Sequence, residues 1–267
     1  MTNKEYWEKR LGGNTYNIQS KKAKKELLKL YKEQAELIKK DIVNLYYNMI
    51  SDDGISTTNL YRYGRFNELL KSIENITGQR ESKEIALITK ILEDTYISVL
   101  GKPSNMEGAV VWNLTNDEKM LGVINANFKG ANFKTRIQRN SRKFINTLQR
   151  EISSAVAGRT TMDRVIATLM ARHGVAYNEA DRLARTEIMR TINQGRINQG
   201  KEKGYKLGYY AYIDDDKHCD LCARLAEETK KNPIPLDELE PIHHPRCRCG
   251  IRILTKLEMK KRGIENG

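Results

Sequence analysis

The residues with the clearest capacity for chemistry are cysteines and histidines that gather between positions 218 and 249. The pattern is a C-x-x-C pair, Cys219 and Cys222, followed by His244 and a C-x-C pair, Cys247 and Cys249. A C-x-x-C turn can place two thiolates on one ion, and in an extended C-x-C pair both side chains point to the same face. Thiolates and imidazoles without a surplus of carboxylates favour zinc over magnesium or calcium. The spacing therefore predicts a zinc site.

The pattern offers more ligands than the four positions of a tetrahedral zinc site can take. We assign Cys219, Cys222 and Cys247 as ligands, and the fourth is either Cys249 or His244. A site filled by protein side chains has no open position for water, which predicts a structural rather than a catalytic metal. The alternative is a set of reduced thiols without metal in a small, turn-rich fold.

The cellular compartment decides between metal binding and disulfides. The N-terminal residues Met1 to Trp7 contain no apolar secretory segment, and no apolar run approaches the ~20 residues that span a bilayer. The sequence therefore predicts a protein of the host cytoplasm, without a membrane partner, whose thiols stay reduced. His218 and His243 are interpreted as surface residues or neighbours of the ligands, and His173 as a helix-end residue.

The charge balance favours a polyanionic partner. The chain has 47 lysines and arginines against 34 acidic residues, a net charge of +13. Between Lys119 and Arg150 no acidic residue occurs, and apolar residues recur there at helical spacing. Such a run can be a solvated helix face, but like charges without counter-charges gain from a nucleic acid. The residues predicted to contact double-stranded DNA non-specifically are Lys129, Lys134, Arg136, Arg139, Arg142, Lys143 and Arg150.

The elements that position these residues are mostly helices, so the predicted class is mainly α with a small β module. Apolar residues three or four apart predict an N-terminal bundle of three antiparallel helices. Its helices are expected at 20–50, with Ser20 as N-cap, at 57–76 and at 82–100, with turns at 51–54 and 77–78. A strand or helix start is expected at 110–112.

Farther along, helices are expected at 162–172 and 178–203, separated by Gly174, after the basic amphipathic helix. A strand at 205–213 and the tail 250–254 are predicted to pair, and 229–240 is expected to be a polar loop. The predicted parts are an N-terminal helical region (1–105), a central basic helical region (106–204), a metal-binding β module (205–257) and a basic tail (258–267).

No catalytic motif occurs in the sequence. G-x-S-x-G, the P-loop, G-x-G-x-x-G and H-E-x-x-H are all absent, so we predict a non-enzyme. Arg185, Glu187 and Arg190 fall close together on one predicted helix and are interpreted as a structural ion pair. Two alternatives remain open: a metal-dependent nuclease of the zinc-stapled HNH type, and a zinc-stapled DNA-binding regulator.

Four pieces of the sequence, in order, resemble the Mu F-like minor head protein family of tailed phages. They are Phe128 to Ile137, similar to W-x-G-x-x-F-x-x-R-I with Phe128 in place of Trp; Arg185 to Asn193, similar to R-T-E-x-x-R-x-x-N; Tyr209 to Cys222, an aromatic strand, Asp and C-x-x-C; and His244 to Cys249, similar to H-P-x-C-R-C. The segment 226–231 departs from the Gly and aromatic residues that often follow the C-x-x-C pair in this family.

The resemblance implies a role as a minor capsid protein in head morphogenesis. Such a protein would take part in procapsid assembly at or near the portal, would lie inside the head of the virion, and would contact packaged DNA. The implied partners are the portal protein and the scaffold or major capsid protein.

Overall fold

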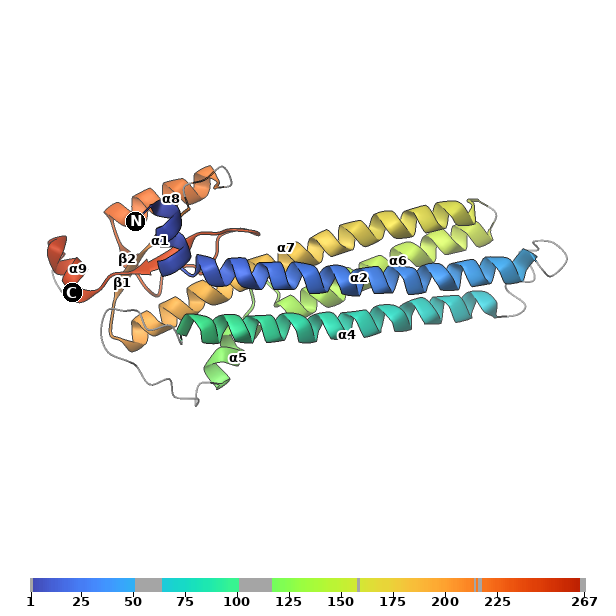
Figure 1. Ribbon diagram of the computed structural model, residues 1–267, viewed down its shortest axis with the longest axis horizontal. Coiled ribbons are helices and arrows are strands. Elements are labelled where there is room, and N and C mark those ends of the chain that lie inside the picture. The colour runs from blue at the N-terminus through green and yellow to red at the C-terminus, as the bar shows by residue number, and fades with distance from the viewer. Residues whose placement is uncertain are drawn as a thin grey trace. The chain divides into compact units, whose positions relative to one another are not determined.

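The computed structural model describes residues 2–50, 64–100, 117–157, 159–213, 215 and 218–264. The chain is mainly helical, with a small antiparallel sheet near the C-terminus (Figure 1). The elements are α1 Asn3–Arg10, α2 Gly13–Ile50, α4 Arg65–Leu100, α5 Asp117–Asn125, α6 Phe133–Val156, α7 Met162–Glu202, β1 Leu207–Ala211, α8 Asp220–Lys231, β2 Ile234–Pro235, β3 Gly250–Ile253 and α9 Lys256–Lys261. Among the described residues, none of the helices combines the length and the apolar character that crossing a bilayer requires.

The N-terminal helices are longer than expected from the sequence. α2 begins at Gly13, so Ser20 is not an N-cap but is buried inside the helix. The described part of the helix predicted at 57–76 and the helix predicted at 82–100 form the single helix α4 from Arg65, and the expected break at Thr77 and Gly78 is wrong. The Thr77 side chain is fully buried and accepts a hydrogen bond from Gln34 Nε2 at 3.0 Å. A glycine inside a helix costs about 1 kcal/mol relative to alanine, which the packing on both sides of Gly78 outweighs.

The same correction applies to α7, which continues through Gly174 as one helix. His173 is therefore not a helix-end residue: it is buried within α7, and its ring meets the ring of Tyr31 edge-on at 5.9 Å. The buried residues Leu169 and Ala180 flank the glycine and hold the helix to its neighbours on both sides. The expected turn at 51–54 and the expected element at 110–112 lie outside the described residues.

Contacts divide the chain into two compact units that are both discontinuous in sequence. Unit 1 comprises Met1–Lys22, Thr89–Ala126 and Arg182–Gly267, and unit 2 comprises Ala23–Ile88 and Asn127–Asp181. The long helices α2, α4 and α7 contribute residues to both. The four parts predicted from the sequence, with boundaries at 105, 204 and 257, are each continuous in the chain. They stay a prediction.

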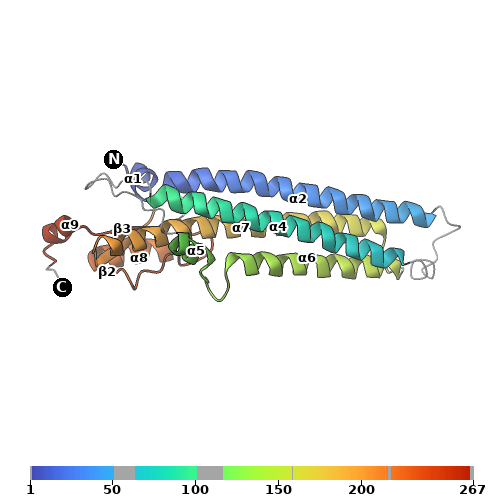
Figure 2. The ribbon, with the colours of Figure 1, turned by 90° about the horizontal axis from the view of Figure 1, so that it is seen from below.

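Unit 2 is a bundle built from parts of α2, α4, α6 and α7, which lie side by side in both views (Figures 1 and 2). Each helix turns an apolar stripe inward, as a period of 3.6 residues allows. The buried core consists of Ile38, Ile42, Leu45, Phe66, Leu69, Ile73, Phe144, Leu148, Ile152, Val165 and Leu169. Burial of these side chains from water is the main force that holds the bundle together.

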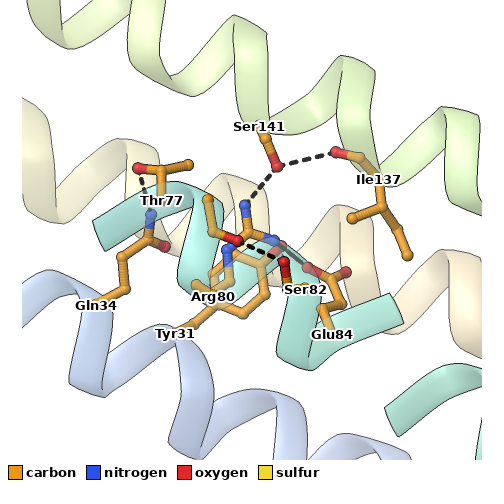
Figure 3. A network of polar contacts seen from close by, with 9 residues as sticks. Tyr31, Gln34, Thr77, Arg80, Ser82, Glu84, Ile137 and Ser141 are labelled. Carbon is orange, nitrogen blue, oxygen red and sulfur yellow. Dashed lines mark hydrogen bonds and ion pairs between the residues drawn. The ribbon is translucent and has the colours of Figure 1, made fainter. Parts of the chain in front are cut away.

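A buried polar network interrupts this apolar bundle (Figure 3). Arg80 forms an ion pair with Glu84 one helical turn away, and their side chains are 5% and 1% exposed. The Arg80 guanidinium also donates to Ser141 Oγ at 2.7 Å and to the Tyr31 hydroxyl at 3.0 Å. Tyr31 in turn donates to Glu84 at 3.0 Å, and burial raises the pKa values of both Tyr31 and Glu84. Side chains from α2, α4 and α6 therefore depend on one buried charge pair.

We expect Arg80→Met to destabilise the protein by about 3–5 kcal/mol, because it leaves the Glu84 carboxylate buried without its counter-charge. The double variant Arg80→Met/Glu84→Met removes both charges and should recover most of that loss. Urea unfolding followed by circular dichroism measures both values. The exposed pair Lys22–Asp94 supplies the control: Lys22→Met should change stability by less than about 1 kcal/mol. A double variant as unstable as Arg80→Met would contradict the explanation by an isolated charge.

The sheet of unit 1 has the strand order β2-β1-β3, with both neighbours antiparallel to β1. β1 and β3 pair from Gly208 opposite Ile253 to Ala211 opposite Gly250, which confirms the predicted pairing of the strand with the tail. The segment predicted as a polar loop instead contains the end of α8 and the short strand β2. A small core lies on this sheet and consists of Ile197, Tyr210, Ala226, Leu236, Leu239 and Ile251.

Candidate metal centre

The cysteines and His244 come from two places in unit 1. Cys219 is the N-cap residue of α8 and Cys222 lies in its first turn, so the C-x-x-C pair opens a helix where a turn was expected. His244, Cys247 and Cys249 lie on the segment that leads into β3. β1 joins the two places, because β3 pairs with it and α8 packs on it.

The ligand atoms form two overlapping groups that share Cys222, and each group is compact enough to hold a metal ion. His244 Nε2 lies 3.2 Å from Sγ of Cys219 and 3.2 Å from Sγ of Cys222, and Cys222 Sγ lies 3.6 Å from Cys247 Sγ. The ligand atoms of Cys222, Cys247 and Cys249 all lie within 4.8 Å of one another, as do those of Cys219, Cys222 and His244. With Zn–S bonds of about 2.3 Å, tetrahedral ligands lie about 3.8 Å apart. Together the two groups contain all five candidates, with Cys222 in both.

The thiols are close enough to share protons. The hydrogen bond from Cys222 lowers the pKa of Cys247, and the same contact raises the pKa of Cys222. The contact with Cys222 and burial also raise the pKa of Cys249. Burial opposes ionisation of Cys219, but the backbone N–H of Cys222 and the neighbouring His244 outweigh it and lower the pKa. Without a cation, the cluster cannot hold all four thiolates in so small a volume.

His244 is oriented as a ligand through Nε2. Its Nδ1 lies 2.9 Å from the backbone oxygen of Pro245, a contact in which Nδ1–H donates. That hydrogen bond leaves the Nε2 lone pair free and directed toward the cysteines. Burial lowers the pKa of His244, but the bond to Pro245 and the nearby Cys247 and Cys219 raise it overall.

The helix α7 holds the second half of the cluster in place. Asn193 Nδ2 donates to the backbone oxygens of Cys249 at 2.7 Å and Pro241 at 2.8 Å, and Asn193 Oδ1 accepts from Ile251 N at 3.2 Å. Thr186 Oγ1 accepts from the backbone N–H of Arg246 at 3.0 Å, where the chain takes a positive φ of 61°. These contacts were not predicted from residue spacing, because they join positions far apart in the chain.

Residues 146–252 match the model of a family described as phage Mu protein F like protein. The matched segment contains Thr186, Asn193 and the whole cysteine cluster. This segment is similar to the phage Mu protein F like family. The match confirms the resemblance to that family and includes three of its four pieces, whereas Phe128 to Ile137 lies outside the match. No curated protein and no solved structure gives a significant match to the chain.

The family segment also contains the predicted ion pair. Glu187 and Arg190 pair at 2.7 Å within α7, and both side chains are buried, 1% and 3% exposed. Arg190 also donates to the backbone oxygen of Ile124 at 3.2 Å, which ties α7 to α5. Arg185 lies half-buried on the same helix. The contacts of this pair join α7 to α5, and its structural role stays a prediction.

Two more histidines of the family segment lie outside both ligand groups. His218 is exposed and packs at 5.1 Å against the ring of Tyr212. His243 meets the ring of Tyr210 edge-on at 4.4 Å, and its Nδ1 lies 3.6 Å from Glu240. The structure thus places His218 on the surface and His243 beside the core of the sheet.

The seven basic residues predicted to contact DNA fall into two sets within unit 2. Arg139, Arg142, Lys143 and Arg150 lie along α6 and, together with Arg159, line an open groove. The other set comprises Lys129, Lys134 and Arg136, which lie at or before the start of α6.

The second set is engaged locally. The Arg136 guanidinium donates to the backbone oxygens of Phe128 and Ala131, which closes the loop before α6. Lys129 lies 5.5 Å from the Phe128 ring. Lys134 lies 5.8 Å from the ring of Phe133, so these side chains stabilise the loop and the helix start as well as adding charge.

Proposed function

We propose that the protein acts in phage head morphogenesis, as a minor structural protein of the head. The observation that carries this proposal is the family match over residues 146–252. Its working place would be the host cytoplasm during assembly and then the virion, at or near the portal. Its protein partners would be the portal protein and the scaffold or major capsid protein.

A structural zinc ion is the second part of the proposal. The ligands would be Cys219, Cys222, Cys247 and His244, because Nε2 of His244 lies against the C-x-x-C pair and its tautomer is set by the backbone. Cys249 would then lie beside the ion as a neighbour whose pKa is raised by its contacts with Cys222 and Cys247 and by burial. With four protein ligands there is no open position for a reactive water, which supports a structural role and not a nuclease.

Purified protein, prepared without chelator, should contain about one zinc per chain by elemental analysis. Cys222→Ser should reduce this to well under half an equivalent, because Cys222 belongs to both ligand groups. The matched control is His218→Ala, which removes a nearby histidine outside both groups and should keep the metal. Wild-type protein with little zinc would contradict this part of the proposal.

Contact with packaged DNA is the third part. The cations along α6 recur at 139, 142, 143 and 150, and all four line the same groove. The ammonium group of Lys143 lies 3.9 Å from the carboxylate of Glu179. A row of this kind suits the regular charges of a phosphate backbone and carries no base-reading geometry.

The triple variant Arg139→Ala/Arg142→Ala/Arg150→Ala should bind a labelled duplex more weakly. The slope of log K against log salt should fall by about 0.9 for each phosphate that the variant no longer neutralises. Fluorescence anisotropy at several salt concentrations measures both quantities. The control, Lys40→Ala/Lys71→Ala/Lys83→Ala, removes the same charge from exposed sites on α2 and α4. Equal losses in both variants would show that net charge, and not the groove, determines binding.

The head-morphogenesis role is tested directly by quantitative mass spectrometry of purified procapsids and mature heads. We expect the chain in both, at a copy number comparable to that of the portal protein and far below that of the major capsid protein. Absence from both particles would overturn the proposal.

A further inference from the structure

The first helix of the chain lies against the strand segment that carries the C-x-C pair. Trp7 of α1 is only 2% exposed, and its Nε1–H donates to the backbone oxygen of Arg248 at 2.8 Å. Arg248 is the residue between Cys247 and Cys249. A side chain near the N-terminus therefore holds the peptide that joins the two cysteines.

The turn after α1 packs against Gly250, the residue that follows Cys249. Leu11 is 2% exposed, and a Cβ at Gly250 would lie 2.8 Å from Leu11 Cβ. The turn itself depends on glycine: Gly12 has a φ of +79°, and a Cβ at Gly13 would lie 2.0 Å from the Trp7 ring. Trp7 thus contacts the residue before Cys249, and Leu11 contacts the residue after it.

The side chain of Arg248 is fixed as well. Its guanidinium forms two hydrogen bonds with Asp215, at 2.9 Å and 2.6 Å. Asp215 lies four residues before Cys219, so this ion pair links the segments that carry the two pairs of cysteines. With its backbone oxygen bound by Trp7 and its guanidinium bound by Asp215, Arg248 has little freedom to move.

Other contacts anchor α1 to the same unit. Arg196 of α7 is deeply buried, which lowers its pKa to about 10, and it donates to the backbone oxygen of Arg10 at the end of α1. Tyr6 lies 5.1 Å from the guanidinium of Arg252 on β3. Side chains of α7 and β3 therefore hold α1 against the rest of unit 1.

We propose that α1 forms the outer wall of the metal centre and that Trp7 is a positioning residue that controls how long the metal is retained. The inference rests on the zinc ion of the proposed function. Trp7, Leu11 and the rest of α1 lie outside the segment 146–252 that matches the family.

The test uses the full chain loaded with one equivalent of zinc and measures transfer of the ion to a chromophoric chelator. Trp7→Ala should release zinc about 10- to 100-fold faster, the range found when support of metal ligands is removed. Trp7→Phe keeps most of the ring but lacks the N–H donor, so its release rate should lie between those of the wild type and Trp7→Ala. Lys9→Ala, an exposed position on α1, is the matched control and should leave the rate unchanged.

Cobalt substitution gives a readout that general destabilisation would not move. The absorption bands of Co²⁺ bound to thiolates should shift in Trp7→Phe, because the peptide of Arg248 is no longer held. Wild-type release rates and an unchanged cobalt spectrum in folded Trp7→Phe would overturn the inference, even if Trp7→Ala fails to fold. Less than half an equivalent of zinc in the wild type would instead overturn the zinc proposal itself, and this inference with it.

Discussion

One constraint on unit 1 is that four cysteine thiols lie close together at the edge of a small three-stranded sheet. Its three strands are short, and few large apolar side chains lie on them. Thiols that lie 3.6 Å apart resist simultaneous ionisation, so a cation would convert a repulsive cluster into a crosslink. Such a crosslink would join the start of α8 to the segment before β3.

The sequence predicted that the cysteines and His244 lie close together, but not which residues support them, for one physical reason. Ligand spacing is local: two cysteines separated by two residues share a turn wherever the turn lies in the fold. The supporting residues Asn193 and Trp7 act over 56 and 241 positions, and no local pattern distinguishes them from other polar or aromatic residues on a helix. The motif shared with the family was the one available signal for Asn193, and Trp7 had none.

The helix ends predicted from the sequence were wrong for a similar reason. Glycine lowers helix propensity locally, which predicted breaks at Gly78 and Gly174, but long buried stripes on both sides outweigh so small an effect. Conversely, the charged residues at the end of α8 led to the prediction of a loop. The structure has a helix there, which begins after Cys219 and packs on the sheet. Arginine side chains also differ in their surroundings. Arg80 and Arg190 are buried in ion pairs within their helices, whereas Arg142 is exposed on α6. Residue type alone did not separate these cases.

The separation between Trp7 and Arg248 has a consequence for synthesis. The helix α1 leaves the ribosome well before its docking site, because 241 positions separate Trp7 from Arg248. At roughly 5–20 residues per second, many seconds pass between the two events. During that interval the Trp7 indole has no partner strand, and all residues of unit 2 are synthesised before the interval ends. The contact of Trp7 with the segment between Cys247 and Cys249 therefore forms only after the bundle residues have been made.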